Sequence, residues 1–169
     1  MNPRLLRLLA VALAALVTFL AWRWWGSDER RLWSRLGELE SAFAKTGEER
    51  QLAAVVRAKA VLDLFAPEFR ISAAPYEGSI EDREQLAGIV YRYREGATRI
   101  AVTDGERGLE IRPNGTAEMR CVITVRGDGA QGPGVERFRA RFAWRRDDGV
   151  WTISEVEILE RLESSGLGF

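Results

Sequence analysis

TAEMRCVITVRGDGAQGPGVERFRARFAWRRDDGVWTISEVEIL, residues 116–159, decides the fold of this 169-residue chain. Apolar and polar residues alternate along 116–126, along 137–145 and along 151–159, with turn residues between these runs. A period of two predicts antiparallel strands that bury one face and leave the other in water. Because a sheet with one apolar face needs a cover, we expect helices from the N-terminal half to pack against it.

The chain before residue 116 contains three helical patterns. Leucines and a phenylalanine recur at steps of three and four along residues 32–43, which is the spacing of one helix face. A second helix is expected from Glu48 to Pro67, and a capping-box pattern at 79–82 predicts a third that ends at Gly96. The expected apolar side of the second helix comprises Leu52, Val55, Val56, Ala60, Leu62 and Phe65.

Short strand patterns lie between and after these helices. Residues 69–73 form one, and residues 98–103 begin the sheet. The Asp104-Gly105 dipeptide predicts a turn before a short return strand at 109–111, and the glycine-rich residues 127–134 predict a loop. The order of elements predicts an α+β fold: a curved antiparallel sheet packed against three helices, preceded by a transmembrane helix.

The first 25 residues have the composition of that transmembrane helix. Residues 8–22 are uncharged and mostly apolar, and residues 5–25 include only Arg7 and Arg23 as charges, near the ends. A bilayer core needs about 20 helical residues, and terminal arginines can reach the interface. The side chains expected to contact the membrane are Leu8, Leu13, Leu16, Phe19, Trp22, Trp24 and Trp25.

A cleaved signal peptide is the alternative, since it also combines basic and apolar regions. Cleavage requires small residues after the apolar core, whereas this core ends in WRWW at 22–25, so an uncleaved anchor is favoured. Arg4 and Arg7 favour a cytoplasmic N-terminus. We therefore predict a single-pass protein of the inner membrane with its domain on the periplasmic or extracytoplasmic side. The predicted divisions are an anchor at 1–27, a domain at 28–162 and a flexible tail at 163–169.

Composition excludes several function classes. The chain has 25 basic and 25 acidic residues, and residues 26–169 carry a net charge of −3, so no nucleic-acid partner is expected. There is no histidine, which removes the commonest general base and metal ligand, and we expect no metal and no cofactor. The single cysteine, Cys121, lies in an apolar alternation and is expected to be a buried small hydrophobe.

The element order and several short phrases resemble the nuclear-transport-factor-two-like superfamily, which has a cone-shaped α+β fold. The matching phrases are LFAPEF at 64–69, the helix start at Ser79, GTAEM at 115–119 and DGVWTI at 148–153. The resemblance spans about residues 29–160 and implies a pocket between the helices and the concave sheet face. Members include ketosteroid isomerases, polyketide cyclases and dehydratases, SnoaL-like proteins, and non-catalytic modules such as single-span periplasmic scaffolds of type IV secretion systems.

The catalytic patterns of that superfamily match poorly. The isomerase tyrosine on the first helix is missing, because no tyrosine lies between Arg31 and Pro75, and a histidine-dependent dehydratase is excluded. Asp63 is the candidate catalytic acid, and the alternative role for it is a solvent-facing cap. The candidate ligand-pocket residues are Asp63, Tyr76, Tyr91 and Tyr93, with core packing as the alternative role for the tyrosines.

A row of arginines, Arg137, Arg139, Arg141 and Arg145, is predicted on one strand face. It indicates either an anionic partner or, as we favour, a solvated outer face with acidic cross-strand partners such as Glu118, Glu155 or Glu157. Taken together, the sequence favours a membrane-anchored, non-catalytic binding or assembly module. A homodimer through the sheet face and an envelope protein are candidate partners. The alternative is a small-molecule enzyme of the ketosteroid isomerase or polyketide cyclase type acting in the cone pocket.

Overall fold

The computed structural model describes residues 13–20, 27–74, 78–129 and 132–165. Residues 13–20 are helical, and their large apolar side chains are more than half exposed. Within the described ranges, no helix combines the length and apolar composition needed to span a membrane. Most of the predicted anchor, including Leu8, Trp22, Trp24 and Trp25, lies outside the described residues.

Seven strands in the described part of the chain form one sheet in the order β1-β4-β5-β6-β7-β2-β3. They are β1 (Lys45–Thr46), β2 (Phe65–Ala73), β3 (Ser79–Ile80), β4 (Ala97–Ile111), β5 (Thr116–Gly129), β6 (Gly132–Asp147) and β7 (Val150–Ser165). All neighbours are antiparallel except β2 and β7, which pair in parallel. The strands predicted in residues 116–159 are therefore confirmed as the centre of the sheet.

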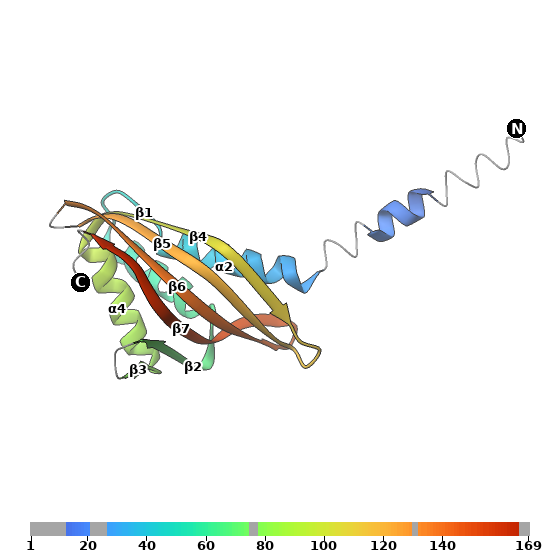
Figure 1. The fold of residues 1–169 in the computed structure, drawn as a ribbon. Helices are drawn as coiled ribbons and strands as arrows, with labels where there is room; N and C mark the ends of the chain where they lie inside the picture. Colours follow the sequence, from blue (N-terminus) through green and yellow to red (C-terminus); the bar gives the residue numbers. More distant parts are fainter. Residues whose placement is uncertain (1–12, 21–26, 75–77, 130–131, 166–169) are drawn as a thin grey trace, which may run out of the picture.

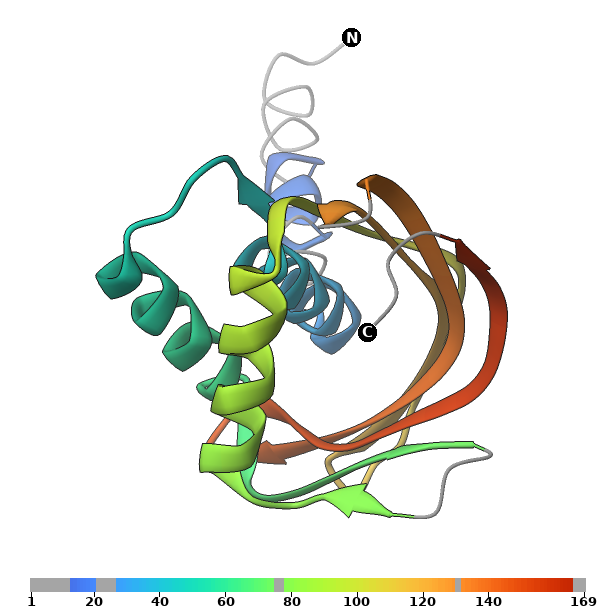
Figure 2. The same ribbon diagram turned by 90° about the vertical axis from the view of Figure 1, so that its left-hand side faces the viewer.

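Three helices cover the concave face of this sheet: α2 (Asp28–Phe43), α3 (Gln51–Leu62) and α4 (Arg83–Glu95). Figure 2 shows the sheet curling around α2, with α4 across the open side and α3 outermost. Figure 1 shows the long strands running side by side against α2 and α4. The α+β fold with a curved sheet and three covering helices is thus as predicted, and the predicted transmembrane helix is not found in the described residues.

The core lies between α2 and the inner face of the sheet. Leu32 and Leu36 of α2 are fully buried, as are Met119 of β5, Trp144 of β6 and Ile153 of β7. Burying apolar area of this kind contributes about 25 cal/mol per Å² and is the main force that holds α2 inside the sheet. The alternation of β5 to β7 therefore supplies one apolar wall and the helical repeat of α2 supplies the other.

Two basic side chains, Arg94 and Lys45, connect the C-terminal ends of α2 and α4. The buried Arg94 guanidinium of α4 pairs with both oxygens of Glu49, at 2.7 and 3.0 Å, and donates to the carbonyls of residues 42–44 at the end of α2. In return, Lys45 Nζ donates to the carbonyls of Arg94 and Ala97 at 2.6 Å. Arg94 of α4 thus satisfies carbonyls that the end of α2 leaves unpaired, and Lys45, which follows α2, does the same at the end of α4.

Some local predictions were wrong. β4 runs without interruption through Asp104-Gly105, because a bulge between Gly105 and Gly108, with Glu106 at φ 49°, accommodates residues that were predicted to turn the chain. The α4 cap is Asp82, which accepts from the Gln85 N–H at 2.7 Å, and not the predicted serine. The predicted loop at 127–134 is largely strand, since β5 reaches Gly129 and β6 starts at Gly132.

The outer face of the sheet is polar and internally paired. Arg141 donates to Glu157 and Glu155 at 2.9 and 3.1 Å, and Arg139 donates to Glu160 at 2.8 Å. Arg145 pairs with Asp147. The pairs of Arg139 and Arg141 confirm, for these two residues, the acidic cross-strand partners that we favoured for the arginine row, whereas Arg145 and Asp147 lie on the same strand.

Candidate functional site

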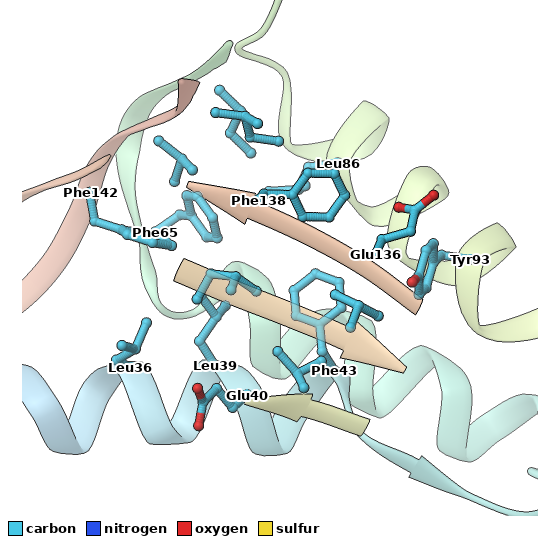
Figure 3. Close-up of a pocket in the computed structure, with 16 residues that line it drawn as sticks. Leu36, Leu39, Glu40, Phe43, Phe65, Leu86, Tyr93, Glu136, Phe138 and Phe142 are labelled. Atoms are coloured by element: carbon cyan, nitrogen blue, oxygen red, sulfur yellow. The ribbon is translucent and has the colours of Figure 1, made fainter. Parts of the chain in front are cut away.

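A cavity of about 280 Å³ lies between α2, α4 and the concave face of the sheet (Figure 3). Its lining is apolar except for Glu40, Tyr93 and Glu136. The apolar lining residues are Leu36, Leu39, Phe43, Phe65, Ile71, Leu86, Val102, Ile123, Val125, Phe138, Phe142, Val156 and Ile158. Concave, mostly apolar sites with a few polar groups are typical of small-molecule binding.

Glu40 is an acid of the cavity wall with a raised pKa. Its carboxyl hydrogen-bonds the carboxyl of Asp104 on β4, and two carboxyl groups can do so only if one carries a proton. Burial, and then the charge of Asp104, raise the pKa of Glu40 from 4.5 to about 7. One oxygen of Glu40, Oε1, is buried and accepts no N–H or O–H from the described part of the chain.

Arg107 determines which member of this pair is ionised. Its Nη2 donates to Asp104 Oδ1 at 2.7 Å and its Nε donates to Oδ2, which lowers the pKa of Asp104. Glu40 therefore holds the shared proton and Asp104 stays charged. Arg107 lies in the bulge of β4 between Gly105 and Gly108, which allows it to reach Asp104 of the same strand. The Arg107 guanidinium also lies 5.0 Å from the ring centroid of Trp33.

The thiol of Cys121 lies close to this acid pair. Burial, followed by the charges of Asp104 and Glu40, raises its pKa to about 12. A thiol with so high a pKa remains protonated and unreactive at neutral pH. This agrees with the expected role of Cys121 as a buried small hydrophobe.

The other two polar groups lie together on the opposite side of the cavity, where Figure 3 shows Tyr93 of α4 next to Glu136 of β6. Burial, and then the charge of Glu136, raise the pKa of Tyr93 to about 12. Glu136 is buried on the strand face that carries Phe138, and Arg161 approaches it at 3.8 Å. Arg161 also lies 5.8 Å from the Phe138 ring, so its charge is held at this end of the cavity.

Of the predicted pocket residues that the structure describes, only Tyr93 lines this cavity. Asp63 is the C-cap of α3 with an exposed side chain, in a shallow hollow between α2 and α3, so the prediction that it lines the cone is corrected. Tyr91 lines a separate hollow with Lys45 and Arg94, and Tyr76 lies outside the described residues.

Glu40, Asp104 and Glu136 were not predicted from the sequence. A signal existed for Glu40, because it lies four residues after Leu36 and three before Phe43, on the edge of the apolar face of α2. Glu136 stands two residues before Phe138 in the same alternation and so points inward. Asp104 gave no such signal, since the Asp-Gly dipeptide is typical of a turn. In the described ranges, no group of three or more potential ligands could hold a metal ion.

Comparison with known proteins agrees with this architecture. The family model of the SnoaL-like domain matches residues 55–157. A provisionally named scytalone dehydratase from Novosphingobium aromaticivorans is 10% identical, with a TM-score of 0.67 over 84% of this chain and 89% of the other. An NTF2-like protein with a cystatin-like fold from the same organism is 16% identical, with a TM-score of 0.61 over 88% of each chain.

A third solved structure, a provisionally named calcium/calmodulin-dependent protein kinase II association domain from Xanthomonas campestris, is 16% identical, with a TM-score of 0.62 over 79% of this chain and 89% of the other. No curated protein matches the chain. At these identities the solved structures establish the fold alone. The family match covers more than half of the sequence, and the chain therefore belongs to the SnoaL-like domain family, within the superfamily that its sequence resembles.

Proposed function

We propose that the cone binds one small, largely apolar molecule whose carbonyl or similar acceptor group meets protonated Glu40. The observation that carries this proposal is a protonatable carboxyl with a pKa of about 7 in the wall of an otherwise apolar cavity. The volume of about 280 Å³ suits a ligand of one or two fused rings. Phe65, Phe138 and Phe142 supply aromatic surface against which such rings can pack.

The proton on Glu40 makes binding depend on pH. Below pH 7 the carboxyl is protonated, and its single O–H, which donates to Asp104 in this structure, would turn from Asp104 to an acceptor on the ligand. Above pH 7 it is ionised, and an acceptor on the ligand would then face a negative charge. We therefore expect neutral ligands with an acceptor group to bind more tightly at pH 6 than at pH 8.

Prodan, a naphthalene ketone whose emission reports the polarity around it, is a suitable probe. Its emission is expected to shift to the blue with the wild-type protein, and Val125→Phe, which fills part of the cavity, should abolish this shift. Leu162→Phe, at an exposed position on β7, is the matched control and should bind like wild type. Equal binding to both variants would place the probe outside the cavity and refute the proposal.

A second candidate function, general acid–base catalysis by Glu40, is favoured by the same pKa, because a catalytic acid or base works best when its pKa lies near the working pH. In ionised form Glu40 could remove a proton from carbon next to a carbonyl and return it, as the isomerase or cyclase alternative requires. Exchange of the α-protons of 2-tetralone in D₂O, followed by NMR, tests this directly. Acceleration by wild type that Glu40→Gln abolishes would support catalysis; exchange at the rate of buffer would leave only binding.

The membrane anchor, the location outside the cytoplasm and a protein partner in the envelope are parts of the same proposal. They are supported by the apolar run at 5–25 and by the exposed apolar side chains of residues 13–20. Alkaline extraction of membranes, with sequencing of the mature N-terminus, separates an anchor from a cleaved signal: protein found only in the soluble fraction would overturn the anchor.

The homodimer through the sheet would have to form on a face that carries many internal ion pairs. Sedimentation of the purified chain tests whether this dimer forms.

A further inference from the structure

The first half of helix α3 presents its larger apolar side chains to solvent, whereas Val61 near its end is fully buried. Ala54 and Ala58, which are small, face the protein, whereas Leu52, Val55 and Val56 are 77%, 52% and 60% exposed. These three residues were predicted on the buried apolar side of the helix, and that prediction is wrong. A helix of a soluble domain normally buries its larger apolar side chains, so this arrangement requires an explanation.

The charges of α3 are all of one sign. Arg57 and Lys59 within it and Arg50 at its N-cap are exposed, residues 50–62 contain no acid, and the one acid at its caps is the C-cap, Asp63. None of the three cations forms an ion pair with the described part of the chain. An exposed apolar stripe flanked by unpaired cations is typical of a helix that lies in the interface of an anionic bilayer.

We propose that α3 is a membrane-contact helix that docks on a lipid surface containing anionic headgroups. Leu52, Val55 and Val56 would enter the boundary between headgroups and acyl chains, and Arg57 and Lys59 would reach the headgroup phosphates. α3 packs on α2 and α4, the two helices that line the cavity, so docking would hold the cavity close to the bilayer. The proposal depends neither on the ligand of the cavity nor on the predicted anchor.

A second copy of the chain fits this surface less well. Two α3 helices packed face to face would bring Arg57 and Lys59 against the same residues of the partner, without an acid of α3 to offset them. Three aliphatic side chains are also a small part of the roughly 800 Å² that each partner buries in a stable interface. A lipid surface satisfies both the apolar stripe and the cations.

The test places an environment-sensitive NBD dye on α3 in the full chain, at Val56→Cys, and on the outer sheet face at Arg120→Cys as a control. Cys121 does not compete for the dye, because it is buried and its thiol pKa is raised to about 12. The chain is mixed with phosphatidylcholine vesicles, with or without phosphatidylglycerol. We expect brighter, blue-shifted emission from position 56 only when the anionic lipid is present, and no change at position 120.

Two further variants separate the contributions of charge and apolar contact. Replacing both Arg57 and Lys59 with Gln should weaken the docking equilibrium of α3 roughly thirtyfold, since each cation near an anionic surface contributes about a factor of five. Leu52→Gln should weaken docking, whereas Leu162→Gln, exposed on β7, should leave it unchanged. The dye at position 56 reports the surroundings of α3 itself, so the expected results are the same whether or not the N-terminal segment is also in the bilayer.

Several outcomes would overturn the proposal. Emission from position 56 that does not change with any vesicle, or that changes equally on neutral and anionic vesicles, contradicts an anionic lipid partner. A blue shift in the absence of vesicles that grows with protein concentration indicates that α3 contacts a second copy. Equal changes at positions 56 and 120 mean that the whole domain adheres without a preferred face.

Discussion

Replacing Glu40 with Gln should change how stability depends on pH. A raised pKa means that the folded state binds the proton more tightly than the unfolded state does. The contribution of Glu40 to stability is therefore fully present below pH 4.5 and is lost as pH rises through about 7. The Gln side chain mimics the protonated acid, because it can still donate to Asp104, and it does not titrate.

The size of the effect follows from the shift. Moving a pKa from 4.5 to about 7 corresponds to roughly 3 kcal/mol for a fully buried group. Because the Glu40 side chain is only half-buried and water screens part of its charge, we expect about 1–2 kcal/mol. Asp104 titrates at lower pH, since Arg107 lowers its pKa, and it does not change the comparison between pH 5 and pH 8.

Urea unfolding at pH 5, 6, 7 and 8 measures this directly. From pH 5 to pH 8, the free energy of unfolding of Glu40→Gln should rise relative to wild type by about 1–2 kcal/mol. Glu38→Gln is the matched control, because Glu38 lies on the same helix, is exposed and pairs with Arg35. Parallel pH profiles for wild type and Glu40→Gln would show that Glu40 has an ordinary pKa, and would refute the reasoning.

Further substitutions test the rest of the structure. Asp104→Asn should lower the pKa of Glu40, because it removes the neighbouring negative charge, and Arg107→Gln should raise it, because it removes a positive charge. NMR titration of Glu40 in each variant checks both, and pKa shifts in the same direction would contradict the contact of Glu40 with Asp104. Arg94→Met should cost about 3–5 kcal/mol of unfolding free energy, since it leaves Glu49 without its buried partner, whereas Arg92→Met on the exposed side of α4 should stay within about 0.5 kcal/mol. Leu32→Ala should cost about 3 kcal/mol, because it leaves a cavity under α2; a loss below about 1 kcal/mol would show that α2 does not pack in the core.

The sheet could be predicted because its signal is local. Along residues 116–126, 137–145 and 151–159 apolar side chains alternate with polar ones, and that pattern is sufficient to assign strand, inner face and order along the chain. The parallel pairing of β2 with β7 could not be predicted in this way, since it joins residues about 85 positions apart in sequence and leaves no periodic trace. Asp104 was assigned to a turn for the opposite reason: the Asp-Gly signal is local, and the bulge overrides it.

The candidate site was harder to predict than the fold. Its acid pair joins Glu40 on α2 to Asp104 on β4, and neither residue is unusual until the fold brings them together. Asp63 looked more suitable because apolar residues surround it in sequence, yet those neighbours pack inward from either side and leave the carboxyl in water. On α3 the apolar pattern was detected correctly, but a pattern alone does not tell whether a face is buried in protein or exposed to another partner.

The central claim is that Glu40 is a protonatable group in the wall of a ligand cavity. Carbon-13 NMR of the side-chain carboxyls of labelled glutamate, titrated from pH 3 to pH 9 with and without prodan, tests it most directly. We predict one carboxyl that titrates near pH 7, that is missing in Glu40→Gln, and whose midpoint rises when prodan is bound, because the ketone prefers the protonated form. Glutamates that all titrate near the ordinary pKa of 4.5, unaffected by prodan, would contradict the account.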